Sequence, residues 1–275
     1  MLSLFKRLIP TPIKKWVNIR RREQDYVRRF ALAEKGTHLP IFLFQPGKVG
    51  SMSLYTSLKQ IYPGPVIHAH SLFEPPLHLG IELMIRWLNS GKPLSLICMI
   101  REPISRNISG FFESFEEYVG VPFSESSHQP VELCQLFLER YNHMGMHEWF
   151  HEELHRGTGI NVLEHPVHSP GYQRMDQGVI RFLLLKTELP DAEKIRLVSE
   201  FLSLPKFPLH SVNVAEKKPY AKMYQDVKAL LKIPEPLLLQ ITSAPLIRHF
   251  YTPQEIEDMN IRWKASIPSK SSELD

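Results

Sequence analysis

The chain has 275 residues, of which 43% are hydrophobic and 23% are charged, and this balance suits a globular protein with one large domain. No apolar run reaches the roughly 18 residues that a membrane-spanning helix needs, and residues 1–12 are too interrupted for a secretory signal, so we expect neither. Two cysteines, Cys98 and Cys134, cannot form a disulfide framework. We therefore expect reduced thiols and a cytoplasmic location.

Positive charge is concentrated at the start of the chain. Residues 1–35 contain ten Lys or Arg against three Asp or Glu, whereas the remainder contains 23 against 26. The body of the protein is therefore not a basic nucleic-acid binder. We divide the chain into a basic leader over 1–38, a main domain over 39–266 and a polar tail over 267–275. The leader suits either contact with the anionic inner face of a membrane or a solvated helix at the domain edge.

Strands and helices alternate along most of the main domain. Hydrophobic patterning predicts strands at 41–45, 65–69, 94–100 and 179–186. It predicts helices at 52–61, 77–90, 103–119, 131–155, 191–203, 219–232, 235–243 and 253–263. The stretches at 46–51, 121–129 and 157–175 read as loops or irregular structure. The alternation predicts an α/β fold with a central parallel sheet flanked by helices.

The turn between the first strand and the first helix of this domain carries the strongest functional signal. Its sequence is Gln45-Pro46-Gly47-Lys48-Val49-Gly50-Ser51-Met52-Ser53. A Gly-rich turn at a helix start offers backbone N–H groups and one lysine to a single anion. The NTPase P-loop would need Gly and Ser/Thr where this chain has Phe42 and Val49, and that hydroxyl normally ligates Mg²⁺. The loop therefore predicts binding of a phosphate-like group with no metal required.

A second anion-binding element follows the strand at 94–100. Arg101 stands at the end of this strand, Pro103 suits the first turn of a helix, and Ser109 lies within that helix. A guanidinium and a hydroxyl in this arrangement could contact a second phosphate. Arg106 could assist that site or lie on the surface.

Together these elements resemble the PAPS-dependent sulfotransferases, where PAPS is 3′-phosphoadenosine-5′-phosphosulfate. The stretch from Trp149 through Pro166 and residues 243–263 are further similar to bacterial carbohydrate-type sulfotransferases of capsular polysaccharide synthesis. The resemblance implies a P-loop NTPase-like sulfotransferase fold that moves a sulfuryl group from PAPS to a hydroxyl acceptor, a saccharide or polysaccharide. It places the 3′-phosphate at Arg101 and Ser109. It places the 5′-phosphosulfate at the loop residues Gly47, Lys48, Val49, Gly50, Ser51, Met52 and Ser53.

Sulfuryl transfer also needs a cation at the bridging oxygen and a base for the acceptor hydroxyl. Lys48 is the cation of the loop and suits the first role. The strand at 65–69 ends in His68-Ala69-His70, and a neutral imidazole can take a proton at pH 7. We assign His70 as the base because it lies nearer the strand end, with His68 orienting it or the acceptor. Glu74 is the alternative base, and both histidines could instead be structural.

A competing motif lies in the predicted helix at 131–155. His147-Glu148-Trp149-Phe150-His151 matches the His-Glu-x-x-His pattern of zinc peptidases, and His143 and His155 extend the same helical stripe. The metzincin extension fails because Leu154 and Gly157 replace its Gly and third His, and Glu164 is an arbitrary third ligand. A solvated or groove-facing helix, or adventitious metal binding, explains the stripe as well.

Two further interpretations remain open. A nucleotide-dependent kinase would share the strand–loop–helix arrangement, but it should carry a metal-binding Asp where this chain has Arg101. The segment Lys217-Lys218-Pro219-Tyr220 offers cations and an aromatic ring. It could close over a nucleotide, as a late basic segment does in the sulfotransferases, or simply begin a helix.

Overall fold

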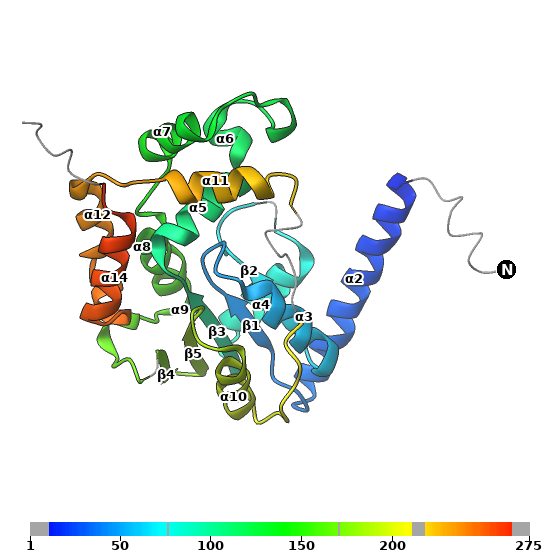
Figure 1. Ribbon diagram of the computed structural model, residues 1–275. Coiled ribbons are helices and arrows are strands. Elements are labelled where there is room, and N and C mark those ends of the chain that lie inside the picture. The colour runs from blue at the N-terminus through cyan, green and yellow to red at the C-terminus, as the bar shows by residue number, and fades with distance from the viewer. Residues whose placement is uncertain (1–10, 76, 170, 211–217, 266–275) are drawn as a thin grey trace, which may run out of the picture.

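Five strands form one sheet at the centre of the molecule, in the order β2-β1-β3-β5-β4 (Figure 1). The computed structural model describes residues 11–75, 77–169, 171–210 and 218–265. The parallel strands are β1 (Ile41–Phe44), β2 (Val66–Ala69), β3 (Leu94–Ile100) and β5 (Ile180–Lys186). The strand β4 (Tyr172–Gln177) pairs antiparallel with β5 at one edge. The predicted α/β class is therefore confirmed, but the sheet is mixed and not wholly parallel.

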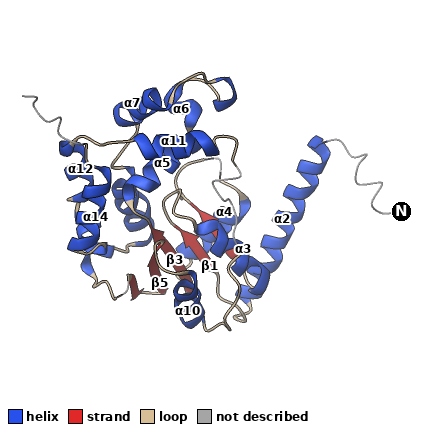
Figure 2. Cartoon of the chain, viewed as in Figure 1, coloured by secondary structure: helices blue, strands red, loops and turns tan. Residues whose placement is uncertain are grey.

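The central strands are buried because helices cover both faces of the sheet (Figure 2). All residues of β1 and β3 are buried, which explains their continuous apolar runs. One face packs against α3 (Ser51–Ile61) and α10 (Asp191–Leu202). Burial of a large side chain such as Phe42 on the other face contributes about 1.5–3 kcal/mol.

The second face is covered by a larger group of helices that share one hydrophobic core. The helices with residues in this core are α2 (Thr11–Glu34), α4 (Leu79–Asn89), α5 (Pro103–Glu113), α6 (Phe115–Val119), α7 (Pro130–Arg140), α8 (Gly145–Trp149), α11 (Ala221–Leu230), α12 (Glu235–Thr242), α13 (Pro245–Phe250) and α14 (Pro253–Trp263). A π-helix, η2 (Phe150–His155), continues α8 and leads into α9 (Arg156–Thr158). Short 3₁₀ turns lie at η1 (Phe123–Glu125) and η3 (Val162–Glu164).

Several predicted boundaries were wrong for local reasons. The predicted helix at 131–155 is divided after Arg140, where the Asn142 side chain accepts a hydrogen bond from the Met144 amide and stabilises a turn. The predicted helix at 103–119 is interrupted at Ser114. The irregular stretch at 157–175 contains the start of β4. The helix α13, which patterning missed, begins with Pro245 at its first position.

The basic leader forms the helix α2 from Thr11 to Glu34, and a turn follows over residues 35–38. Tyr26, Phe30 and Ala33 bury one side of α2 in the core, while its N-terminal half stands away from the body of the molecule (Figure 1). Residues 1–10 and the tail at 267–275 lie outside the described residues. Within the described part, no helix is long and apolar enough to cross a membrane.

Candidate functional site

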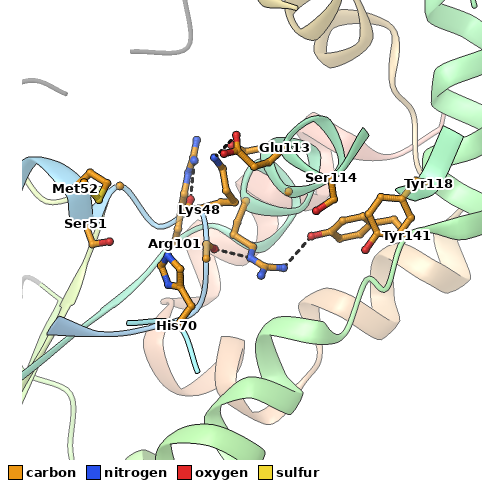
Figure 3. Close-up of a pocket in the computed structure, with 14 residues that line it drawn as sticks. Lys48, Ser51, Met52, His70, Arg101, Glu113, Ser114, Tyr118 and Tyr141 are labelled. Atoms are coloured by element: carbon orange, nitrogen blue, oxygen red, sulfur yellow. Dashed lines mark hydrogen bonds and ion pairs between the residues drawn. The ribbon is translucent and has the colours of Figure 1, made fainter. Parts of the chain in front are cut away.

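A cavity of about 570 Å³ opens at the carboxyl ends of β1, β2 and β3, the edge where ligands bind in parallel α/β sheets (Figure 3). It is bounded by the predicted loop, the end of β2, the end of β3 and one face of α5. The lining residues are Gly47, Lys48, Gly50, Ser51, Met52, His70, Arg101, Arg106, Ser109, Gly110, Glu113, Ser114, Tyr118 and Tyr141. The structure thus brings the two predicted anion-binding elements and His70 into one cavity.

The carbonyl groups of the loop are held by side chains from other parts of the chain. The pairs are His70 Nδ1 to Gln45 O at 2.8 Å, Arg106 Nε to Gly47 O at 3.0 Å, Arg101 Nη1 to Lys48 O at 3.0 Å, and Thr187 Oγ1 to Val49 O at 2.7 Å. Carbonyl oxygens near a bound anion would repel it, and these donors offset their partial negative charge. The loop therefore has the electrostatic character of an anion-binding turn.

The backbone of the loop delivers a helix N-terminus to the cavity. Lys48 has a φ of 69° and Gly50 a φ of 78°, so the turn uses the left-handed region twice. A non-glycine residue in this region is uncommon, and here Arg101 fixes the Lys48 carbonyl. Gly50 is the N-cap of α3 and supplies no side-chain cap. The first amides of α3 lack intrahelical acceptors and are available to an anion.

Lys48 points to a carboxylate across the cavity. Its Nζ lies 3.0 Å from Glu113 Oε2, and Lys218 Nζ and the Tyr220 hydroxyl reach the same oxygen at 3.0 and 3.1 Å. Burial acts to raise the pKa of Glu113, but hydrogen bonds from Lys48 and Lys218 lower it to about 2. Glu113 is therefore ionised at neutral pH. Lys217 lies outside the described residues.

The helix α5 presents a polar face to the cavity and an apolar face to the core. Arg106, Ser109, Gly110 and Glu113 recur at the three- to four-residue spacing of one helix face. Arg106 Nη1 donates to the Tyr141 hydroxyl at 3.0 Å. A Cβ atom at position 110 would collide with that hydroxyl, so glycine is needed where Tyr141 packs against α5. Arg106 thus lines the cavity and, through its hydrogen bond to Gly47 O, holds the loop in place.

The two histidines of β2 have different surroundings. The His70 ring is exposed to the cavity, and its Nδ1–H donates to Gln45 O, which leaves Nε2 with a free lone pair. The surrounding protein displaces bulk water and so lowers the pKa of His70 below its usual value. His68 does not line the cavity; its Nε2 lies 2.8 Å from Ser51 Oγ. Burial, with the charges of His70 and His78, lowers the pKa of His68 to about 3.

Three further predicted residues, besides His68, lie away from the cavity. The Val49 side chain is buried in the hydrophobic core beside α3 and α10, so only its backbone can serve the loop. Ser53 lines a separate cavity of about 100 Å³ with residues of α10. Glu74 is exposed, and its amide donates to Ser71 Oγ at 2.9 Å.

The residues of the His-Glu-x-x-His motif have separate surroundings in the structure. Among the described residues, no group of three His, Cys, Asp or Glu side chains is placed to hold a metal ion. His147 has both ring nitrogens buried without a hydrogen-bond partner, and burial lowers its pKa to about 4. Glu148 accepts a hydrogen bond from Asn142 Nδ2 at 2.7 Å, and His151 is the second residue of the π-helix. His143 is buried in the core against Phe137.

Sequence reasoning missed several lining residues, namely Gly110, Glu113, Ser114, Tyr118 and Tyr141. One signal could have found Glu113, because it lies four residues after Ser109 and seven after Arg106 on a predicted helix. Tyr141 reaches the cavity from α7's end through tertiary packing, for which the local sequence carries no pattern.

The fold is a mixed α/β fold with a cavity, lined by Lys48, Arg101 and Arg106, at the carboxyl edge of its parallel strands. Residues 129–252, somewhat less than half of the chain, match the family model described as "putative capsular polysaccharide synthesis protein". The matched segment contains Tyr141 of the cavity but neither the loop nor α5. No curated protein and no solved structure shows significant similarity to the chain.

Proposed function

We propose that the chain is a PAPS-dependent sulfotransferase that sulfates a saccharide hydroxyl during capsular polysaccharide synthesis. The observation that carries this proposal is the convergence of two cationic elements and one imidazole on a single cavity. One element is the loop with Lys48, the other is Arg101 with Ser109, and the imidazole is His70. The cavity volume of about 570 Å³ lies within the usual range for small-molecule sites.

The residues present suit a donor with phosphate groups at two ends. The loop amides, the α3 N-terminus and Lys48 would hold the 5′-phosphosulfate. Arg101 and Ser109 would hold the 3′-phosphate through a guanidinium and a hydroxyl. The chemistry supplied by PAPS is a sulfuryl group on a good leaving group, and no metal is required by this donor set.

The side chains also suit the proton and charge transfers of the reaction. His70 Nε2 would take the acceptor hydroxyl proton while the acceptor oxygen forms a bond to sulfur. The bond from sulfur to the bridging oxygen breaks, and the electron pair stays on the 5′-phosphate of adenosine 3′,5′-bisphosphate. Lys48 would stabilise the charge on that oxygen. The products are a sulfate ester, the bisphosphate and a proton held by His70.

The saccharide acceptor is supported by the description of the matched family, which concerns capsular polysaccharide synthesis. The test is incubation of the purified full chain with ³⁵S-labelled PAPS and a panel of bacterial capsular glycans, with γ-labelled ATP in a parallel arm. We expect ³⁵S in a glycan and none of the ATP label. Transfer from ATP alone, or no transfer to any glycan while PAPS fails to bind, would overturn the proposal.

A further inference from the structure

Glu113 is the one acidic residue among the described side chains that line an otherwise cationic cavity. It is the last residue of α5, where a negative charge is disfavoured by the helix dipole. Glu113 is exposed, so it does not contribute a buried contact to the core. Neither helix stability nor core packing therefore explains a carboxylate at this position.

The contacts of Glu113 resemble those of a bound anion. Its Oε2 atom accepts three hydrogen bonds, from Lys48 Nζ at 3.0 Å, Lys218 Nζ at 3.0 Å and the Tyr220 hydroxyl at 3.1 Å. The two lysines come from segments far apart in the sequence, the anion loop and the start of the α11 region. Glu113 thus forms an ion pair with Lys48, the cation that the proposed mechanism assigns to the sulfuryl donor.

We propose that Glu113 sets the charge selectivity of the donor cavity by competing with ligand anions for Lys48. This inference deepens the proposed function and rests on the cavity being an anion site. A small anion that reaches only the loop must replace the Glu113 carboxylate at Lys48, and it is repelled by the negative charge of Glu113. A ligand with a second phosphate gains the contacts of Arg101 and Ser109 as well. Those two contacts do not involve Lys48, so a bisphosphate can bind while Glu113 holds Lys48, whereas a single anion at the loop must compete for it; on this proposal Glu113 weakens single anions more than bisphosphates.

The experiment measures binding to the full chain by calorimetry with two probes: inorganic sulfate and adenosine 3′,5′-bisphosphate. The variants are Glu113→Gln, which removes the charge, and Glu113→Asp, which keeps it on a shorter side chain. Glu116→Gln, an exposed carboxylate on α6, is the matched control. Thermal unfolding of each variant verifies that it is folded.

We expect Glu113→Gln to bind sulfate about three- to tenfold more tightly, the range expected for one partly exposed charge contact. Its affinity for the bisphosphate should rise by a smaller factor, so that the ratio between the two ligands falls. Glu113→Asp should lie between Gln and the wild type, and Glu116→Gln should match the wild type.

An unchanged or weaker affinity for sulfate in folded Glu113→Gln would overturn the inference, because it would show that Glu113 positions Lys48 without competing for it. The same conclusion follows if Glu113→Asp binds sulfate as tightly as Glu113→Gln. These readouts need no turnover. Failure of sulfuryl transfer in the wild type, with the sulfate response to Glu113→Gln intact, would therefore reject the proposed reaction and leave the charge selectivity standing.

Discussion

The indole Nε1 of Trp149 donates a hydrogen bond to the backbone carbonyl of His70, 79 residues earlier in the chain. Glu153 of the π-helix reinforces this connection, because it accepts from the Ser71 hydroxyl at 2.7 Å and the Leu72 amide at 2.9 Å. The segment that matches the polysaccharide-synthesis family therefore supports the strand end that carries the candidate base. The matched segment thus contacts the chain directly beside the cavity residue His70.

Lys48→Ala should reduce turnover by about 100-fold or more while the fold persists, because losing one donor aimed at developing charge commonly has that effect. The measurement is kcat with labelled PAPS, alongside thermal unfolding. Lys222→Ala, which removes an exposed lysine from α11, is the control and should behave as the wild type. Near-normal turnover in Lys48→Ala would remove this residue from the mechanism.

Arg101→Ala should weaken adenosine 3′,5′-bisphosphate more than adenosine 5′-phosphate, because the guanidinium is assigned to the 3′-phosphate. Both ligands should lose some affinity, since Arg101 also holds the Lys48 carbonyl. Calorimetry with the two nucleotides gives the comparison. Equal losses for both would show that Arg101 acts only through the loop.

His70→Ala should lower kcat steeply with little effect on PAPS affinity, because a base acts on the acceptor. The neutral imidazole is the active form, and its pKa is lowered by loss of water around the ring. The rate should therefore rise with pH through a value below the usual 6.5 and stay level above it. A pH–rate profile of the wild type checks this direction.

His68→Ala and Glu74→Ala are the parallel variants for that assignment. His68 lies behind Ser51, and Glu74 does not line the cavity, so both should retain much more activity than His70→Ala. If Glu74→Ala alone abolishes turnover, the base is Glu74 and the donor assignments are unaffected.

The parts of the fold that could be predicted are those whose pattern is set by burial. The strands β1, β3 and β5 are covered on both faces and read as apolar runs. The strand β4 alternates exposed Arg174 with inward Gln173, which is fully buried and donates to two carbonyls. A buried polar residue breaks the apolar–polar alternation that identifies an edge strand, and so β4 escaped prediction.

The candidate site likewise has a part that the sequence could predict and a part that it could not. The loop and Arg101 could be predicted because a strand end, glycines and cations lie together in the sequence. The side-chain hydrogen bonds to the loop carbonyls could not be predicted, because Thr187 is 138 residues from Val49 and Arg106 is 59 residues from Gly47. The direction of the Val49 side chain likewise depends on packing against α3 and α10.

His147→Leu should make the protein less sensitive to acid. The unfolded imidazole has a pKa near 6.5 and the folded one about 4, so the unfolded state binds the proton first as pH falls. The free energy of unfolding then drops by about 1.4 kcal/mol per pH unit from this group between the two values, and by no more below pH 4. Urea unfolding across that range measures the slope.

The control for this variant is His151→Leu, since the His151 side chain is 75% exposed. It should keep the acid sensitivity of the wild type. At neutral pH His147→Leu should be at least as stable as the wild type, because it removes two buried nitrogens without partners. A large loss of stability at neutral pH would contradict this account.

The basic leader should bind vesicles that contain anionic lipid and ignore neutral ones. Arg21 and Arg22 are exposed on the half of α2 that stands away from the body. Replacing Arg20, Arg21 and Arg22 by Ala should weaken co-sedimentation about 100-fold, at about 1 kcal/mol for each cation. The control replaces the exposed lysines Lys206, Lys222 and Lys232. Equal losses in both variants, or no sedimentation of the wild type, would favour the solvated-helix interpretation.

The side-chain hydrogen bonds to the carbonyls of Gly47, Lys48 and Val49 have a thermodynamic consequence. They originate from α5, from the end of β3 and from the residue after β5, so the loop takes its shape only when the sheet has assembled. Once assembled, the loop is preorganised, and a ligand need not supply the entropy of ordering it. The proposed anion affinity would thereby be coupled to cooperative folding, because a chain that opens between β3 and β5 would lose the shape of the loop and the ligand together.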